Sequence, residues 1–206
     1  MSLKTSNRGQ IDPFIVMDVM REANALDAVG ENIVHLEVGQ PSTAAPVRVR
    51  EAAIEALQSD RLGYTDALGI APLRDGLATH YRDFYGVDVD PARIVITTGS
   101  SGAFLLAFLS AFDVGDRVAL AAPGYPAYRN ILSALGVEPV VVETRLEDRF
   151  QPTPELLAQV EGDLDGLILA SPSNPTGTML GDPEIAELTQ YCRENGIRFI
   201  SDEIYH

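Results

Sequence analysis

The hydrophobic and polar positions in the first part of the chain predict mainly helices. Residues 12–28 place apolar side chains three or four positions apart, which is typical of an amphipathic helix, and Gly30 follows its predicted end. The same spacing predicts a helix over 47–58 and another over 70–86. A shorter apolar run, 33–43, predicts a strand that enters a Gly-Pro loop.

From residue 93 onward, strand-length apolar runs alternate with helical segments. The predicted strands are 93–98, 117–122, 138–144, 165–171 and 197–202. The predicted helices between them are 102–112, 125–135, 154–161 and 183–195. Continuous apolar strands that alternate with helices indicate an α/β fold, a mostly parallel sheet with helices on both faces. Ligands bind such sheets at the carboxyl ends of the strands, so the loops that follow them are where chemistry is expected.

Composition and charge narrow the range of partners. The chain has 206 residues, of which 46% are hydrophobic, values typical of a globular domain. Its net charge of -15 disfavours nucleic acid and anionic membranes as partners. The opening residues are polar, without the apolar segment of a secretory signal, which predicts a cytoplasmic protein. Cys192 is the single cysteine, which excludes an internal disulfide and predicts a buried thiol.

The first loop with candidate chemistry follows the predicted strand 93–98. Gly99, Ser100 and Ser101 precede an apolar helix, so backbone N–H groups, the helix dipole and two hydroxyls converge on one point suited to a phosphate. The same residues are also what an ordinary helix N-cap requires. The segment is neither a dinucleotide-binding glycine motif nor a P-loop, because no lysine follows the glycines.

Three further strand ends carry polar or aromatic side chains. The loop "SPSNPTG" surrounds Asn174 with two prolines and a glycine, which favours either a rigidly held amide or a plain turn. Asp202 ends the last predicted strand as either a functional carboxylate or a solvated strand terminus, and the phenol of Tyr205 follows it. Tyr125 follows 117–122, a position where core packing is the alternative to ligand binding.

Together these loops present a phosphate site, an aromatic ring, an amide, a carboxylate and a phenol. A phosphorylated aromatic ring with a basic nitrogen and a phenolic oxygen, such as pyridoxal phosphate, needs all five. The motifs "VGQP", "YTDALGIAPLR", "TTGSSGAF", "PGYPAY", "SPSNPTG" and "SDEIYH" occur in that order along the chain. With them the sequence resembles the class I/II aminotransferases of fold type I, which are pyridoxal-phosphate enzymes.

The resemblance implies a role for each matching residue. Gly99, Ser100 and Ser101 resemble the phosphate-binding residues, and Tyr125 resembles the ring that stacks on the cofactor. Asn174 and Tyr205 resemble the pair that hydrogen-bonds the phenolic oxygen, and Asp202 resembles the carboxylate that keeps the pyridine nitrogen protonated. Asn174, Asp202 and Tyr205 are therefore the expected catalytic residues. The resemblance also implies a cis peptide bond between Asn174 and Pro175.

Two more matches concern the substrate and a second subunit. Gly39 resembles the backbone position that approaches the amino acid, with a simple turn glycine as the alternative. Tyr64 resembles the tyrosine that reaches a phosphate across a dimer interface, with an ordinary core or surface tyrosine as the alternative. The implied assembly is a homodimer. The implied division is an N-terminal arm and small-domain helix over 1–40, and the first part of the cofactor-binding large domain over 41–206.

None of the matching motifs contains the lysine that the family's chemistry needs. The family holds its cofactor through a Schiff-base lysine, whereas Lys4 is the single lysine and lies in the polar opening, far from any strand end. That lysine is expected beyond His206, so the chain is interpreted as the amino-terminal half of an aminotransferase. Two alternatives are a pyridoxal-phosphate lyase or synthase and a non-catalytic effector-binding module. The short, non-basic N-terminus disfavours a regulator that carries a DNA-binding domain.

Overall fold

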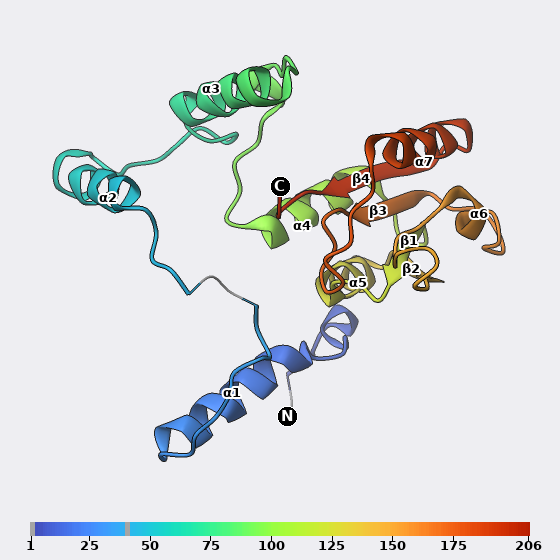
Figure 1. Cartoon of the computed structure of the whole chain (residues 1–206), viewed down its shortest axis with the longest axis horizontal. Helices are drawn as coiled ribbons and strands as arrows, with labels where there is room; N and C mark the ends of the chain where they lie inside the picture. Colours follow the sequence, from blue (N-terminus) through green and yellow to red (C-terminus); the bar gives the residue numbers. More distant parts are fainter. Residues whose placement is uncertain (1–2, 40–41) are drawn as a thin grey trace. The chain divides into compact units, whose positions relative to one another are not determined.

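The computed structural model describes residues 3–39 and 42–206 (Figure 1). The chain divides into two units. The sheet unit joins the segment up to Phe14 to Thr98–His206, and the helical unit spans Ile15–Thr97. These boundaries fall at residues 14 and 97. The division at residue 40 that the family resemblance implies remains a prediction.

The sheet unit is built on a four-stranded parallel sheet. Its strands are β1 (Arg117–Ala122), β2 (Glu138–Glu143), β3 (Gly166–Ala170) and β4 (Arg198–Asp202), in the order β2-β1-β3-β4. All three neighbouring pairs are parallel. The α/β class predicted from the alternating apolar runs is therefore confirmed.

Helices cover both faces of this sheet. They are α4 (Ser100–Ala111), α5 (Pro126–Leu135), the short α6 (Pro154–Leu157) and α7 (Asp182–Glu194). Each face of the sheet has its own hydrophobic core. Consecutive residues of β3 contribute to different cores, because alternate residues of a strand point to opposite faces. Ile168 belongs to the core with Phe108 of α4, whereas Leu167 belongs to the core with Leu188 of α7. A sheet buried on both faces explains why its strands are continuously apolar.

The helical unit contains α1 (Ile15–Ala28), α2 (Val47–Ser59) and α3 (Ala71–His80), close to the predicted ranges. A π-helical turn, η2 (Tyr81–Tyr85), extends α3 until Gly86 takes a left-handed conformation and ends it. A short 3-10 helix, η3 (Pro91–Arg93), follows. In the sheet unit, a similar turn, η1 (Asn7–Gly9), lies near the N-terminus.

Two predicted strands are wrong. The run 33–43 is irregular over its described residues, and 93–98 contains the end of η3 followed by irregular backbone. The described part of the helical unit contains no strand, so neither run has a hydrogen-bonded ladder to join. The amide of Ile96 instead donates to the carbonyl of Leu68 at 3.0 Å. Apolar, β-branched sequence favours a strand only where another strand pairs with it.

None of the helices in the described ranges is both long and apolar enough to cross a lipid bilayer.

Candidate active site

The carboxyl ends of three strands meet at one edge of the sheet. Ala170 of β3 pairs with Asp202 of β4. Ile168, two residues before Ala170 in β3, pairs with Leu120 of β1. In parallel strands this register places the loops that begin at Ala122, Ala170 and Asp202 at the same edge. Residues from sequence positions as far apart as 122 and 202 are thereby brought together.

The carboxylate of Asp202 is held from two sides. The hydroxyl of Tyr128 donates to Oδ2, and the backbone N–H of Ile204 donates to Oδ1 at 3.1 Å. Asp202 is half-buried, whereas Tyr128 is only 6% exposed. This carboxylate is fixed by hydrogen bonds, which the alternative of a solvated strand terminus did not predict.

The Tyr128 side chain is enclosed by other rings. Its ring meets those of Phe104 and Tyr125 edge to face, with centroid distances of 5.1 and 5.4 Å. Burial first, and then the hydrogen bond to Asp202, raise the pKa of Tyr128 well above its usual range. The hydroxyl therefore stays protonated at neutral pH and acts as a donor to the carboxylate.

Asn174 and Tyr205 come from different loops and lie side by side. The Nδ2 of Asn174 lies 3.5 Å from the Oη of Tyr205, a long hydrogen bond. The amide group has a second N–H and the phenol its own O–H, so both can still donate to a ligand oxygen. The pair has the donors that a phenolate oxygen would need.

The loop that carries Asn174 is closed by its own backbone. The N–H of Ser173 donates to the carbonyl of Thr178 at 2.9 Å, and the N–H of Gly177 donates to the carbonyl of Ser173 at 2.8 Å. The peptide bond between Asn174 and Pro175 is cis, which confirms the prediction made from the family resemblance.

A buried glutamine also holds this loop. Gln151 is 1% exposed, and its Nε2 donates to the carbonyls of Ala170 and Thr178 at 3.3 and 3.0 Å. It thus ties the end of β3 to the far side of the Asn174 loop. Neither Gln151 nor Tyr128 is among the site residues expected from the sequence. For Tyr128 a signal existed, because it lies three residues after Tyr125 on the same helical face.

The N-terminus of α4 has the geometry expected of an anion site. Gly99 precedes the helix with φ of 81°, and a Cβ built there would meet no atom within 4 Å. Ser100 and Ser101 form the first turn, where backbone N–H groups and the helix dipole favour an anion. One turn later Phe104 contacts the ring of Tyr128, which bonds Asp202. The start of α4 is therefore linked by packing to the Asp202 carboxylate.

Tyr125 lies between the N-terminal segment and α5. Its ring is half-buried, and Phe14 contacts it edge to face at a centroid distance of 6.0 Å. A cavity of about 20 Å³ beneath the strand ends is lined in part by Tyr125, Tyr128, Gln151 and Asn174. This volume is close to that of one water molecule, so a ring-sized ligand would lie outside it, on the open side of the edge.

Two predicted site residues belong to the helical unit. Gly39 is exposed, and a Cβ built on it would meet no atom within 4 Å. Tyr64 is fully exposed. The roles of Gly39 and Tyr64 remain predictions.

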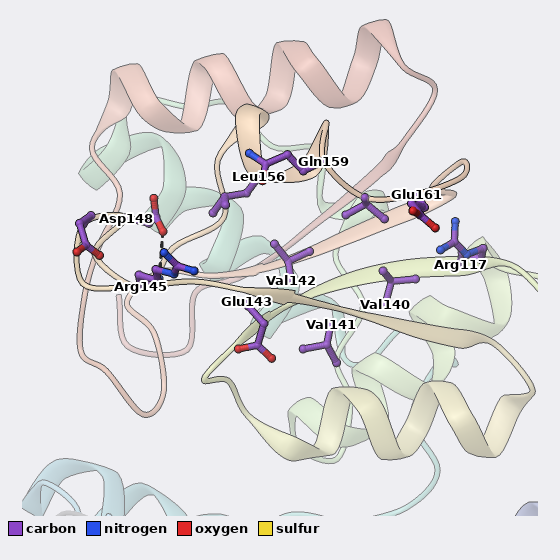
Figure 2. Close-up of a pocket in the computed structure, with 12 residues that line it drawn as sticks. Arg117, Val140, Val141, Val142, Glu143, Arg145, Asp148, Leu156, Gln159 and Glu161 are labelled. Carbon is purple, nitrogen blue, oxygen red and sulfur yellow. Dashed lines mark hydrogen bonds between the residues drawn. The ribbon is translucent and has the colours of Figure 1, made fainter.

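A much larger depression lies along β2 (Figure 2), and its lining includes none of the predicted site residues. Its volume is about 820 Å³, and Val140 and Val142 contribute part of its apolar floor. Charges of both signs surround it, including Arg117, Arg145 and Glu161. The strand-end groups described above do not line it, so its size does not make it the centre of chemistry.

Comparison with protein families and curated proteins gives a consistent result. Residues 31–206 match the family model described as aminotransferase class I and II. A valine–pyruvate aminotransferase of Mycobacterium tuberculosis is 50% identical over 206 residues, which is all of this chain and 53% of that protein. An aspartate aminotransferase of Thermotoga maritima is 34% identical over 193 residues, 92% of this chain and 50% of that protein.

Solved structures agree with this result. An aminotransferase from Mycobacterium tuberculosis matches with a TM-score of 0.94 and 49% identity, over 98% of this chain and 52% of that one. The aspartate aminotransferase of Thermus thermophilus with maleate matches with a TM-score of 0.92 and 31% identity, over 98% and 54%. The chain spans about half the length of the curated relatives it matches.

Proposed function

The chain belongs to the class I and II aminotransferase family, and we propose that the full-length protein is a pyridoxal-phosphate-dependent aminotransferase. It would transfer an amino group between an amino acid and a 2-oxo acid. The observation that carries this proposal is the Asp202 carboxylate, held at the sheet edge by Tyr128 and by the amide of Ile204.

The described residues fit the proposed cofactor. Asp202 offers an oriented carboxylate to a protonated ring nitrogen, and Asn174 and Tyr205 offer donors to a ring oxygen. The first turn of α4 offers N–H groups to a phosphate, and the absence of a Cβ at Gly99 leaves room for it. When bound, pyridoxal phosphate supplies an electron sink for the carbanion that forms at the substrate α-carbon.

Each side chain then has a distinct task. Asp202 holds a proton on the ring nitrogen, and this positive charge increases the electron demand of the ring. Asn174 and Tyr205 stabilise negative charge on the ring oxygen. Tyr125 would contact one face of the ring. The proton transfer at the α-carbon needs a basic group, and the resemblance assigns it to the Schiff-base lysine.

The substrate proposal comes from the relatives. Because a valine–pyruvate aminotransferase is 50% identical to this chain, we propose valine as the first amino donor to test and pyruvate as the first acceptor. Gly39 would approach the bound amino acid through its backbone.

We also propose an assembly and a location for the full-length protein. Family membership and the full exposure of Tyr64 support a homodimer in which Tyr64 reaches the phosphate of the second subunit. The proposed location is the cytoplasm, and the acidic charge of the chain disfavours nucleic acid and anionic membranes as partners.

A half-reaction experiment tests the proposed function. Full-length protein is loaded with pyridoxal phosphate and mixed with single amino acids, and the cofactor absorption is followed. We expect valine to convert the spectrum and pyruvate to restore it. An unchanged spectrum with every amino acid tested would refute the proposal. Release of an elimination product without any 2-oxo acid acceptor would identify a lyase instead.

Substitution of Asp202 tests the assigned roles. We expect Asp202→Ala to keep detectable cofactor binding, because the first turn of α4 is unchanged, and to lose turnover by at least about 100-fold. Asp88→Ala changes an exposed aspartate in the helical unit and is the matched control. Near-normal turnover in Asp202→Ala would show that Asp202 does not partner the ring nitrogen.

A further inference from the structure

Tyr128 is the buried partner of the carboxylate on which the proposed function depends. It lies in α5, 74 residues before Asp202, and its hydroxyl donates to Oδ2. The residues that were expected to bind the cofactor do not include it. Its contact with Asp202 brings the first crossover helix of the sheet to the end of the last strand.

Packing restricts where this hydroxyl can point. The ring of Tyr128 is held between the rings of Phe104 and Tyr125, in a core that also contains Leu132 and Ile168. A buried aromatic ring packed on several sides has few available rotamers. The hydroxyl is therefore presented to Asp202 in one direction, and the raised pKa of Tyr128 keeps its proton in place.

The contacts of the carboxylate leave each of its oxygens able to accept one further hydrogen bond. Each carboxylate oxygen can accept about two hydrogen bonds. The described structure uses one on Oδ2, from Tyr128, and one on Oδ1, from the N–H of Ile204. Asp202 is half-buried, so part of its surface still faces the open edge of the sheet.

We propose that Tyr128 is a positioning residue that acts through Asp202, fixing the carboxylate from the core side so that its remaining lone pairs face the ring nitrogen of the cofactor. This inference rests on the proposed function. It assigns the hydroxyl of Tyr128 a role in cofactor chemistry and its ring a role in packing. Removal of the hydroxyl alone separates the two, since Tyr128→Phe retains the ring.

The first measurement is spectroscopic and uses full-length protein loaded with pyridoxal phosphate. The proton on the ring nitrogen gives a far-downfield signal in proton NMR when it is hydrogen-bonded to a fixed carboxylate. In Tyr128→Phe we expect this signal to shift or to broaden through faster exchange with water. Tyr191→Phe, which removes a hydroxyl from α7 in the other core, is the control and should leave the signal in place.

The second measurement is kinetic. We expect Tyr128→Phe to lower kcat about 10- to 100-fold, the effect of losing one hydrogen bond to a charged group. The KM for the amino acid should change by less than about twofold, because Tyr128 is only 6% exposed and its hydroxyl is directed at Asp202. In an Asp202→Asn background the same substitution should change kcat by less than about twofold, because its effect passes through the carboxylate.

Specific results of these measurements would overturn the proposed role of Tyr128. An unchanged NMR signal together with a kcat within about twofold of the wild type would overturn the role of Tyr128. So would an equal loss of kcat in the Asp202→Asn background. Absence of both the NMR signal and the half-reaction in the wild type would instead refute the proposed function itself. If Tyr128→Phe does not melt cooperatively, Tyr128→His, which keeps a donor on a flat ring, replaces it and is expected to preserve the signal.

Discussion

Replacement of Gln151 by glutamate would place an acceptor where the fold requires a donor. The Nε2 of Gln151 donates to the carbonyls of Ala170 and Thr178, at 3.3 and 3.0 Å, in a site that is 1% exposed. Glutamate has nearly the same shape. Its second oxygen would face two carbonyl oxygens at these distances, so an ionised side chain would lose two hydrogen bonds and meet repulsion.

The expected cost follows from the burial. A buried polar group that loses its hydrogen-bond partner costs about 1–3 kcal/mol, and two carbonyls lose theirs. A buried carboxyl responds by taking up a proton, which raises its pKa above the unfolded value of about 4.3. We therefore expect Gln151→Glu to lower the free energy of unfolding by about 3–5 kcal/mol at pH 7.

The pH dependence gives a sharper signature than the size of the loss. Because the folded state binds the extra proton, the penalty is smallest below pH ~4 and grows as the pH rises through the window between the unfolded and folded pKa of residue 151. Relative to the wild type, the variant should lose about 1.4 kcal/mol of stability per pH unit in that window. The wild-type amide does not titrate.

Urea unfolding of the full-length protein at several pH values is the assay. Gln159→Glu, at an exposed position of the sheet unit, is the matched control and should stay within about 0.5 kcal/mol of the wild type. Cofactor affinity should also fall in Gln151→Glu, because Gln151 holds the loop that carries Asn174. A Gln151→Glu variant as stable as the control at pH 7, with no pH dependence, would refute the reasoning.

Three further results are expected from the fold. Gly166→Ala should lower the free energy of unfolding in urea by about 1–3 kcal/mol, because the new Cβ would lie 2.5 Å from two atoms of the Phe112 ring. Adding Phe112→Leu to this variant should recover part of the loss, and an unchanged stability in Gly166→Ala would contradict the packing. Cys192 is 1% exposed, and burial raises the pKa of its thiol to about 11, so a thiol reagent at pH 8 should label it only after unfolding; rapid labelling of the folded protein would show an open site. The stability that protonated Tyr128 contributes is complete below about pH 10 and is lost as the pH rises above it, so melting temperatures should fall more steeply there in the wild type than in Tyr128→Phe, and parallel curves would argue against its burial.

The sequence predicted the elements whose partners lie within the sheet unit. The four strands from β1 to β4 and the helices around them were readable because a sheet buried on both faces needs uninterrupted apolar strands. The run 93–98 has the same composition but forms no strand, because in the described chain no other strand pairs with it. The apolar composition of a segment predicts that it will be buried, but it does not predict which strand, if any, will pair with it.

The site shows a similar division. Asp202, Asn174, Tyr205 and Tyr125 could be predicted because parallel strands bring their exits to one edge, and the family resemblance supplied their roles. Gln151 could not be predicted, since its partners are backbone carbonyls at Ala170 and Thr178, and any sequence supplies carbonyls. Residues that hold a site through main-chain contacts leave little trace in a motif.

The contact between Tyr128 and Asp202 has a consequence for the order in which the protein is made. The two residues are 74 positions apart, and a ribosome adds about 5–20 residues per second. The Tyr128 hydroxyl is therefore synthesised about 4–15 s before the carboxylate that it will bind. During that interval α5 and β1 can pack, but the Tyr128 hydroxyl in their core does not yet have the carboxylate that it will bind. This contact can form only after β4 joins the sheet edge, so the site and the core around Tyr128 are completed by the same step.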